Sequence, residues 1–200
     1  REPLAEDLNT WNFSFYIGAL DEESVEIQAD IIQELFGLPD QLNELDRNDD
    51  NQLQAVILKG EQGHQAAEIR TNHVISILEQ EGYTLDLMAI EVCNWNTQEA
   101  YNFMLDFIPS LTGDVELIIS NNDAMAIGAI EALLELEVFK DLNEDDHYDS
   151  VNDEWIPVLG VDALSEAVLY LENGTLSGTV LNDSAKQSEA IVELVDALIN

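Results

Sequence analysis

A run of oxygen-bearing side chains, spaced two residues apart, has the pattern of a calcium-binding loop. Alternate residues of such a loop supply carboxylate, amide and backbone carbonyl oxygens, and a sharp turn falls at its sixth position, where Asn51 suits a left-handed backbone. The twelfth position normally brings a bidentate carboxylate, but here it is Ile57, so that ligand must come from elsewhere. A solvated acidic turn is the alternative interpretation. The candidate ligands are Asp46, Asn48, Asp50, Gln52 and Gln54.

A second group of polar and aromatic side chains follows the apolar runs of the sequence. Carboxylates and amides can each engage two adjacent hydroxyl groups, and an indole can cover the apolar C–H face of a sugar ring. Each residue alone is more often a helix cap or a turn former. Their recurrence at five successive strand ends instead favours a site for a neutral polyhydroxylated ligand. The group consists of His64, Arg70, Trp95, Asn122, Asp162 and Asn182.

An alternation of strands and helices must position these residues. Continuous apolar runs predict strands, and apolar residues at helical spacing predict helices between them. Repeated β–α units predict an α/β fold in which a mainly parallel sheet is sandwiched by helices. Ligands bind such sheets beyond the carboxyl ends of the strands, where the candidate residues fall. Strands are expected at residues 12–17, 53–58, 85–92, 115–120, 156–161 and 179–181, and a last helix at 184–200.

The charge balance excludes several classes of function. The 200 residues include 42 acidic and 6 basic side chains, which give a formal net charge of −36. No cluster of Lys or Arg exists to neutralise phosphates, so binding of nucleic acid or of an anionic membrane through a basic surface is excluded. The single cysteine, Cys93, allows neither an intramolecular disulfide nor a cysteine-based zinc site, and its apolar neighbours predict a buried thiol. No apolar run is long enough to span a membrane.

Signatures of catalysis are weak. The sequence contains no nucleophile elbow, no P-loop and no dinucleotide-binding glycine motif. Carboxylates are so frequent that no acid–base pair can be singled out, and we expect a protein that is not an enzyme. His73 is expected on the apolar face of its helix as a structural histidine.

The segment 140–154 is strongly acidic and contains a second series of alternating polar residues. This series has no Gly at the turn and no Glu at the twelfth position, so a solvated acidic loop is favoured over a second cation site. Its members are Asp141, Asn143, Asp145, His147 and Asp149.

Five blocks of the sequence, taken in order, have the character of a family signature. They are KGEQGHQAAEIRT (59–71), NW (94–95), ISNNDAMAIGAIEAL (119–133), PVLGVDAL (157–164) and GTVLND (178–183). In these blocks the chain resembles the periplasmic galactose/glucose-binding proteins of bacterial sugar ABC transporters. The resemblance implies one lobe of a type I periplasmic-binding-protein fold at 1–183, with a calcium loop at 46–54 and an acidic insertion at 140–154. It also implies that the helix at 184–200 belongs, in the family, to the other lobe.

The resemblance assigns roles to individual residues. The family holds calcium in such a loop, and its distant closing carboxylate maps onto Glu116, which fills the gap left by Ile57. The family's sugar-contacting positions map onto the six strand-end residues. One position departs from the family: Ala66 stands where an Asp is usual. The loss of that acceptor favours a glycoside or another monosaccharide over free galactose or glucose.

The implied function is non-catalytic binding of a galactose- or glucose-like monosaccharide, within a solute-binding protein for ABC-type import that carries structural Ca²⁺. The implied partners are the sugar and a membrane permease or chemoreceptor, with no nucleic acid. The implied location is extracytoplasmic (periplasm or cell-surface lipoprotein), and we expect no signal peptide within these 200 residues. Family members have two lobes, so we expect a fragment or a one-lobed protein in which a dimer partner replaces the missing lobe. The alternative is a calcium-stabilised truncated module without effective sugar binding that serves as a scaffold or interaction domain.

Overall fold

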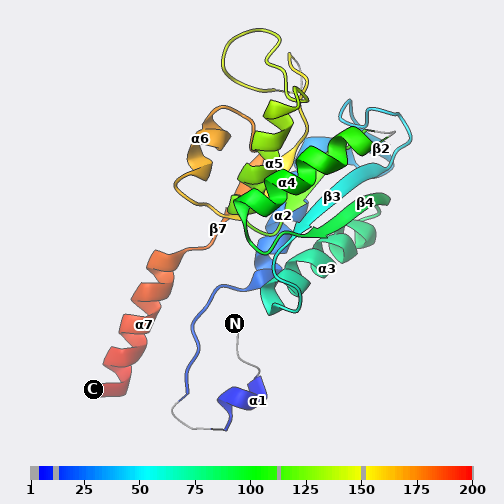
Figure 1. The fold of residues 1–200 in the computed structure, drawn as a ribbon. Helices are drawn as coiled ribbons and strands as arrows, with labels where there is room; N and C mark the ends of the chain where they lie inside the picture. The colour runs from blue at the N-terminus through cyan, green and yellow to red at the C-terminus, as the bar shows by residue number, and fades with distance from the viewer. Residues whose placement is uncertain (1–4, 11–13, 112–113, 150–151, 200) are drawn as a thin grey trace.

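The computed structural model describes residues 5–10, 14–111, 114–149 and 152–199. A sheet of parallel strands in the order β4-β3-β5-β6-β7 forms its centre (Figure 1). These strands are β3 Leu53–Lys59, β4 Leu85–Val92, β5 Leu117–Ser120, β6 Val158–Asp162 and β7 Gly178–Leu181. The helices are α1 Ala5–Leu8, α2 Asp21–Phe36, α3 Gln65–Gln80, α4 Thr97–Phe107, α5 Asp123–Glu135, α6 Ala167–Glu172 and α7 Ser184–Ile199. A short antiparallel hairpin joins β1 Gly37–Leu38 to β2 Gln41–Leu42, and a 3-10 turn spans Ile108–Ser110.

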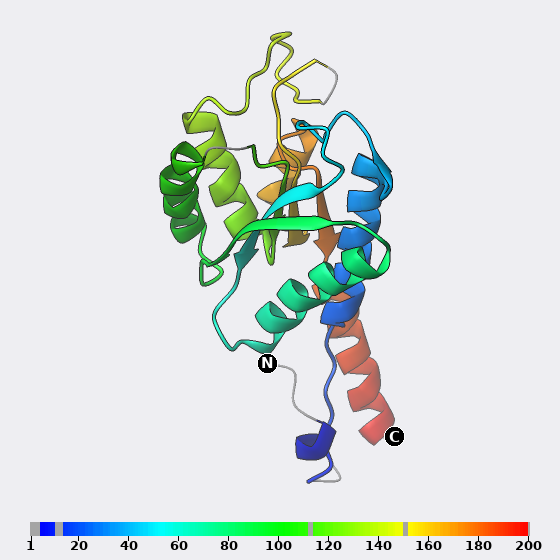
Figure 2. The same ribbon diagram turned by 90° about the vertical axis from the view of Figure 1, so that its right-hand side faces the viewer.

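The helices lie in two layers that cover opposite faces of the sheet. Figures 1 and 2 show α2 and α3 on one face and α4 and α5 on the other, with α6 beside α5. A parallel pair of strands needs a crossover connection, and here helices provide these connections. The predicted α/β fold, a mainly parallel sheet sandwiched by helices, is confirmed.

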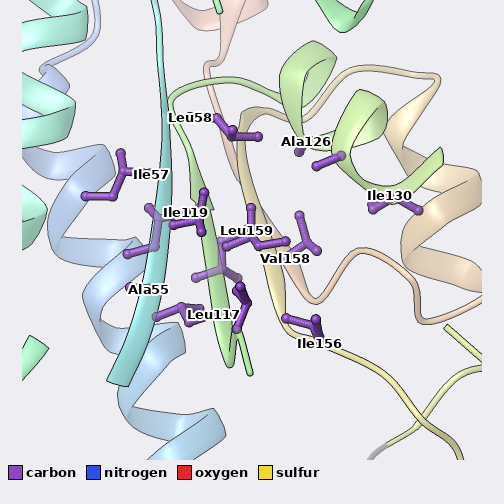
Figure 3. Packing of buried hydrophobic residues seen from close by; sticks show 14 of the residues in the cluster. Ala55, Ile57, Leu58, Leu117, Ile119, Ala126, Ile130, Ile156, Val158 and Leu159 are labelled. Carbon is purple, nitrogen blue, oxygen red and sulfur yellow. The ribbon is translucent and has the colours of Figure 1, made fainter. Parts of the chain in front are cut away.

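The core fills the space between the sheet and both helix layers (Figure 3). Successive side chains of a strand point to opposite faces, so Ile57 lies on the α2 side while Leu58 lies on the side of Ala126 from α5. Every residue of β3 is buried, because this strand is central and both of its faces are covered. Cys93 at the end of β4 is buried as expected, and burial raises the pKa of its thiol to about 12. The thiolate is therefore scarce at neutral pH.

Two local expectations from the sequence are wrong. Residues 14–17 form no strand, although their pattern resembles one, since they make no ladder pairing with the sheet; residues 12 and 13 lie outside the described part. His73 is exposed rather than part of the apolar face of α3. The buried face of that helix is formed by residues such as Val74 and Leu78, and His73 points about 100° away from Val74 around the helix axis.

The last helix and the segment before α2 extend from the same end of the molecule (Figures 1 and 2). The helix expected at 184–200 forms α7 up to residue 199, and residue 200 lies outside the described part. No residue of α7 is buried, and its apolar side chains, including Ile191, Val195 and Leu198, are exposed. Its assignment to a second lobe stays a prediction. Among the described residues, no helix is both long and apolar enough to cross a membrane.

Candidate ligand-binding site

The carboxyl edge of the sheet gathers the six residues predicted at strand ends. Each lies at the end of a strand or in the connection or helix that follows it, so the parallel arrangement brings all of them to one edge. The six positions are His64 at the end of the β3–α3 connection, Arg70 in the second turn of α3, Trp95 in the β4–α4 loop, Asn122 at the start of α5, Asp162 at the end of β6, and Asn182 in the β7–α7 connection.

Arg70 lies at the centre of this group, with a side chain that is 10% exposed. Its Nε donates to Asp21 Oδ1 at 2.8 Å, and its Nη1 donates to the carbonyl oxygen of Asn121 at 2.7 Å. Nη1 also lies 3.9 Å from Asp162 Oδ1. One guanidinium thus joins the start of α2, the β5–α5 connection and the end of β6. Asp21 could not be identified as this partner from its sequence position, because an acidic residue in the first turn of a helix is ordinary.

Trp95 supplies an aromatic surface beside Arg70. Its ring meets the ring of His64 edge-on with centroids 5.2 Å apart, and the guanidinium carbon of Arg70 lies 5.9 Å from the indole centroid. Gly60 packs under the indole, since a Cβ at this position would come within 2.3 Å of the ring. Asn94 and Trp95 both have left-handed backbones, with φ of 49° and 62°. The β4–α4 loop therefore holds the indole over Gly60.

The two amide side chains of the group are held by protein contacts. Asn122 Oδ1 caps α5 by accepting a hydrogen bond from the backbone N–H of Met125 at 3.0 Å, and Asn122 Nδ2 lies 3.5 Å from the carbonyl oxygen of Trp95. Asn182 Oδ1 accepts from Nε2 of Gln187 on α7 at 2.7 Å. With that oxygen occupied, Asn182 presents its NH₂ group, which interacts with the Asp162 carboxylate.

Two cavities open beside Arg70. One, of about 210 Å³, is lined by Tyr16, Asp21, His64, Ala66, Asn182 and Gln187 among others, and the other, of about 150 Å³, lies between α2 and the ends of β6 and β7. Nδ1 of His64 is buried, and it has no hydrogen-bond partner among the described residues. Tyr16 and Gln187 were missed from the sequence, because they come from the segments that flank the sheet and belong to no strand end.

Two carboxyl groups at this edge have raised pKa values. Burial raises the pKa of Asp162, while the charge of Arg70 opposes the rise. Burial also raises the pKa of Asp123, and a hydrogen bond from Thr179 opposes it. A carboxyl whose pKa is raised by folding binds protons in the folded state that the unfolded chain has already released. The free energy of unfolding therefore falls as the pH rises from the unfolded pKa through the folded pKa, and it is level above.

We expect the melting temperature, measured in EDTA at constant ionic strength, to fall as the pH rises above about 4, the usual pKa of an Asp carboxyl. The substitution Asp162→Asn removes one of the two carboxyl groups and should make this slope smaller. Glu26→Gln removes an equal charge from an exposed position of α2 and should leave the slope unchanged. Equal slopes for Asp162→Asn and the parent would contradict the assignment. Circular dichroism at a series of pH values provides the measurement.

The segment 46–54 folds into a compact loop beside the β1–β2 hairpin. The Asp46 carboxylate accepts hydrogen bonds from the backbone N–H groups of Asp50 at 3.2 Å and of Asn51 at 2.8 Å. The amide oxygen of Asn48 accepts from the same N–H of Asp50 at 2.9 Å. Asn51 has φ of 59°, the left-handed turn that the sequence predicts at this position, and its Nδ2 donates to the carbonyl oxygen of Pro39 at 2.8 Å.

Glu116, which is distant in sequence, lies against this loop just before β5. Its side chain belongs to a residue that is 1% exposed, and its Oε1 accepts from the backbone N–H of Arg47 at 2.6 Å. Its Oε2 lies 3.5 Å from the backbone nitrogen of Gln54. Burial raises the pKa of Glu116, and the negative charge of Asp46 raises it further. The fold thus brings a buried carboxylate to the loop that lacked one at position 57.

The loop carries carboxylate and amide oxygens, the kinds of ligand that calcium takes. Oε1 of Gln54 is buried and has no hydrogen-bond partner among the described residues, while Nε2 of the same amide donates to Asp50 Oδ2 at 3.0 Å. The amide groups of Asn48 and Gln52 donate to the same oxygen, so three NH₂ groups surround it as a cation would. In the part of the chain that the structure describes, no three acidic, His or Cys side chains are grouped closely enough to hold a metal. Calcium binding therefore requires these side chains to turn their oxygens inward.

Comparison with known proteins identifies the family. The model of the family described as "Periplasmic binding protein domain" matches residues 5–200. The chain belongs to the periplasmic binding protein family.

Two curated relatives illustrate the range of this family. The D-galactose/methyl-galactoside binding periplasmic protein MglB of Haemophilus influenzae is 35% identical over 199 residues, which cover 99% of this chain and 54% of that protein. The xylitol-binding protein of Mycolicibacterium smegmatis is 25% identical over 144 residues, which cover 72% of this chain and 37% of that protein. The periplasmic binding protein chain thus spans about half, or less, of the length of these relatives. Both are binding proteins rather than enzymes, in agreement with the non-catalytic role expected from the sequence.

Solved structures of periplasmic binding proteins share the fold. An ABC transporter periplasmic solute-binding protein of Actinobacillus succinogenes, with bound D-allose, has a TM-score of 0.74 at 20% identity, covering 98% of this chain and 60% of that one. A periplasmic sugar-binding protein of Pseudomonas fluorescens has a TM-score of 0.69 at 22% identity, covering 99% and 53%. The resemblance seen in the five sequence blocks is therefore confirmed for the family and for its type I fold.

The acidic segment 140–154 repeats the backbone shape of the loop 46–54, with left-handed residues at matching positions. The Asp141 carboxylate accepts from the backbone N–H groups of Asp145 at 3.3 Å and Asp146 at 2.9 Å, as Asp46 does in the first loop. Asp153 accepts from the backbone N–H of Leu142 at 2.8 Å, in the place that Glu116 has there. None of these acidic residues is buried, as expected for a solvated loop, and residues 150–151 lie outside the described part.

Proposed function

We propose that this chain is a sugar-binding lobe of a solute-binding protein for ABC-type sugar import, without catalytic activity, and that it is stabilised by a structural calcium ion. The proposal rests on one observation above all. Six polar and aromatic side chains from five strand ends form one connected group around Arg70 at the carboxyl edge of the sheet. The names of the relatives support a sugar as the ligand, since one binds D-galactose or methyl-galactoside and one structure holds D-allose.

The chemistry of the group suits a pyranose. Trp95 offers an indole face for the apolar C–H face of the ring. The Asp162 carboxylate accepts hydrogen bonds from hydroxyl groups, and the NH₂ group of Asn182 beside it donates to them. The unpartnered Nδ1 of His64 adds one more polar group that a ligand would satisfy.

The choice of sugar follows from the cavity beside Ala66. That cavity, of about 210 Å³, has Asp21 and Tyr16 on its wall, and the small side chain of Ala66 leaves it open. A glycoside or a substituted monosaccharide fills such a space better than a free hexose does. We therefore propose that methyl-galactoside binds more tightly than galactose or glucose.

The partners and the location follow from the same family. The family and the Haemophilus influenzae relative are described as periplasmic, which supports an extracytoplasmic location for this chain, in the periplasm or as a cell-surface lipoprotein. A membrane ABC permease or a chemoreceptor is the partner expected of a loaded sugar-binding lobe. The acidic balance of the chain, with a net charge of −36, gives no support to a nucleic-acid partner.

The affinity of the isolated chain should be low. Among the described residues the site lies at the edge of one five-stranded sheet, and the only other sheet, the β1–β2 hairpin, follows the opposite end of α2 and lines neither cavity. One face of a bound sugar then stays in water, and its hydrogen bonds compete with solvent. We expect a dissociation constant in the millimolar range, equivalent to about −4 kcal/mol.

A titration of the ¹⁵N-labelled chain with methyl-galactoside, galactose and glucose, followed by NMR, tests the proposal. The indole N–H signal of Trp95 and the amide signals of Asn182 should shift with methyl-galactoside at the lowest concentration. Trp95→Ala should abolish the shifts, while the exposed control Glu26→Gln should retain them. Micromolar affinity would contradict a one-sided site and would call for a dimer partner, tested by sedimentation. If no sugar shifts any signal while EDTA still lowers the melting temperature, the chain is instead a calcium-stabilised interaction module.

A further inference from the structure

The end of β6 carries two residues in an unusual backbone conformation. Asp162 has φ of 113° and Ala163 has φ of 49°, a region that residues with a Cβ rarely adopt. Residues in such conformations persist only where the surrounding structure holds them, and they gather at functional sites. Since Asp162 belongs to the group around Arg70, the contacts that hold this turn bear directly on the proposed site.

A buried carboxylate, that of Asp123, holds the turn through hydrogen bonds. Asp123 is the first residue of α5 and has no exposed surface. Its Oδ2 accepts from the backbone N–H of Leu164 at 2.7 Å, and its Oδ1 accepts from the hydroxyl of Thr179 on β7 at 2.6 Å. The oxygen of that hydroxyl in turn accepts from the backbone N–H of Ala163 at 3.2 Å. The two amides that follow Asp162 are thus fixed by one carboxylate, directly and through Thr179.

The backbone of β6 leaves space for this carboxylate only because residue 160 is glycine. A Cβ on Gly160 would lie 2.1 Å from Asp123 Oδ1 and 3.3 Å from its Cα. Asp123 Oδ1 therefore sits against the strand that carries Asp162, and a side chain at position 160 would displace it. Gly160, Asp123 and Thr179 come from β6, α5 and β7, and together they form a unit beside the turn, which we call the β6 clamp.

We propose that Asp123 is a positioning residue for ligand binding, which through the β6 clamp holds the strained turn at Asp162 and so directs the Asp162 carboxylate to the sugar. This inference rests on the proposed function for its consequence in binding. Asp123 itself touches the turn and not the cavities beside Arg70. Both of its oxygens accept hydrogen bonds, so an amide in its place would turn an NH₂ group toward a donor. Asp123→Asn keeps the size of the side chain and breaks the clamp.

Two readouts separate the clamp from sugar binding. The first is hydrogen exchange of the backbone amides of Ala163 and Leu164, which needs no sugar. We expect Asp123→Asn and Thr179→Val each to speed the exchange of these amides at least tenfold, with the amides of β3 unchanged. The second is the dissociation constant for methyl-galactoside, which should rise at least tenfold in Asp123→Asn and should not change in the exposed control Glu26→Gln.

A rescue experiment tests the role of backbone strain. Glycine adopts left-handed φ values without cost, so Ala163→Gly should keep the turn in place with less help from the clamp. Added to Asp123→Asn, it should restore part of the lost affinity, whereas a merely structural role for Asp123 would leave the affinity low. Thr179→Val serves where Asp123→Asn does not fold. Unchanged amide exchange in a folded Asp123→Asn or Thr179→Val variant would overturn the clamp. A parent chain that binds no sugar would refute the proposed function, and the exchange data would still decide on the clamp.

Discussion

Chelation of calcium is expected to lower the melting temperature of this chain by about 5–10 °C. An ion that binds only the folded state stabilises it by RT ln(1 + [L]/Kd), about 2.7 kcal/mol at a hundredfold excess over Kd, and about 1 kcal/mol shifts the melting temperature of a chain of this size by roughly 2–4 °C. The proposed ligands are Asp46, Asn48, Asp50, Gln52 through its carbonyl, Gln54 and Glu116. Differential scanning calorimetry with CaCl₂ and then with excess EDTA provides the measurement.

The physical reason for this effect is the charge around the loop. Glu116 is buried with a raised pKa, and Asp46 adds negative charge beside it. A calcium ion would offset this repulsion, give the unpartnered Oε1 of Gln54 a ligand, and link the loop to the strand that follows Glu116. Mg²⁺ should substitute poorly, since it demands tight octahedral geometry and releases its waters reluctantly.

Glu116→Gln provides the decisive variant, because it removes a charge and a bidentate ligand while it keeps the shape of the side chain. We expect its melting temperature to be nearly the same with calcium and with EDTA. The control Glu26→Gln removes the same charge from an exposed position and should respond to calcium as the parent does. A parent whose melting temperature is unaffected by EDTA would show that the loop 46–54 is a solvated acidic turn.

The substitution Arg70→Met is expected to have the second large effect, on stability and on sugar binding together. It removes the cation that Asp21 and Asp162 share and leaves the carbonyl oxygen of Asn121 without its donor. Loss of one partner of a buried ion pair costs about 3 kcal/mol or more, which corresponds to a fall of roughly 6–12 °C in the melting temperature. The NMR shifts caused by methyl-galactoside should disappear in the same variant.

Two further variants sharpen this prediction. Arg70→Lys keeps the charge, but an ammonium cannot reproduce the planar fork that reaches three acceptors, so most of the loss should remain. Lys59→Met is a matched control: the Lys59 side chain is as buried as that of Arg70, and its Nζ pairs at 2.8 Å with Glu68, whose side chain is 36% exposed. Its stability loss should be smaller, and sugar binding should persist. Equal effects of Arg70→Met and Lys59→Met would refute a special role for Arg70.

Local patterns in the sequence were sufficient for the elements and for the edge of the sheet where the site lies. A continuous apolar run such as 53–58 allows little but a central strand, because both of its faces must be covered. The apolar residues Val25, Ala29, Ile32 and Phe36 repeat at helical spacing, and they form one buried face of α2. The turn at Asn51 was also predictable, because the hydrogen bonds that form it join residues only a few positions apart.

Features that depend on pairing between distant segments were not predictable in this way. The pattern at residues 14–17 is that of a strand, yet a strand forms only where a neighbour supplies ladder hydrogen bonds, and none does there. His73 was misplaced because a shift of one residue on a helix turns a side chain by about 100°. The apolar residues on both sides of His73 in the sequence do not decide whether its side chain belongs to the buried or to the exposed face of α3.

In the candidate site, too, some features follow from local sequence and others from contacts between distant segments. The sequence determined which residue types follow each strand, and a parallel sheet necessarily brings those positions to one edge. Only the tertiary structure decided that Asp21 would meet Arg70 across 49 positions, that Glu116 would meet the loop across 69, and that Asp123 would hold Leu164 across 41. Contacts of this kind depend on how the connections fold and on which polar side chains the fold buries away from water. A buried carboxylate or guanidinium must find such a partner, and its identity is fixed by the packed fold and not by spacing along the chain.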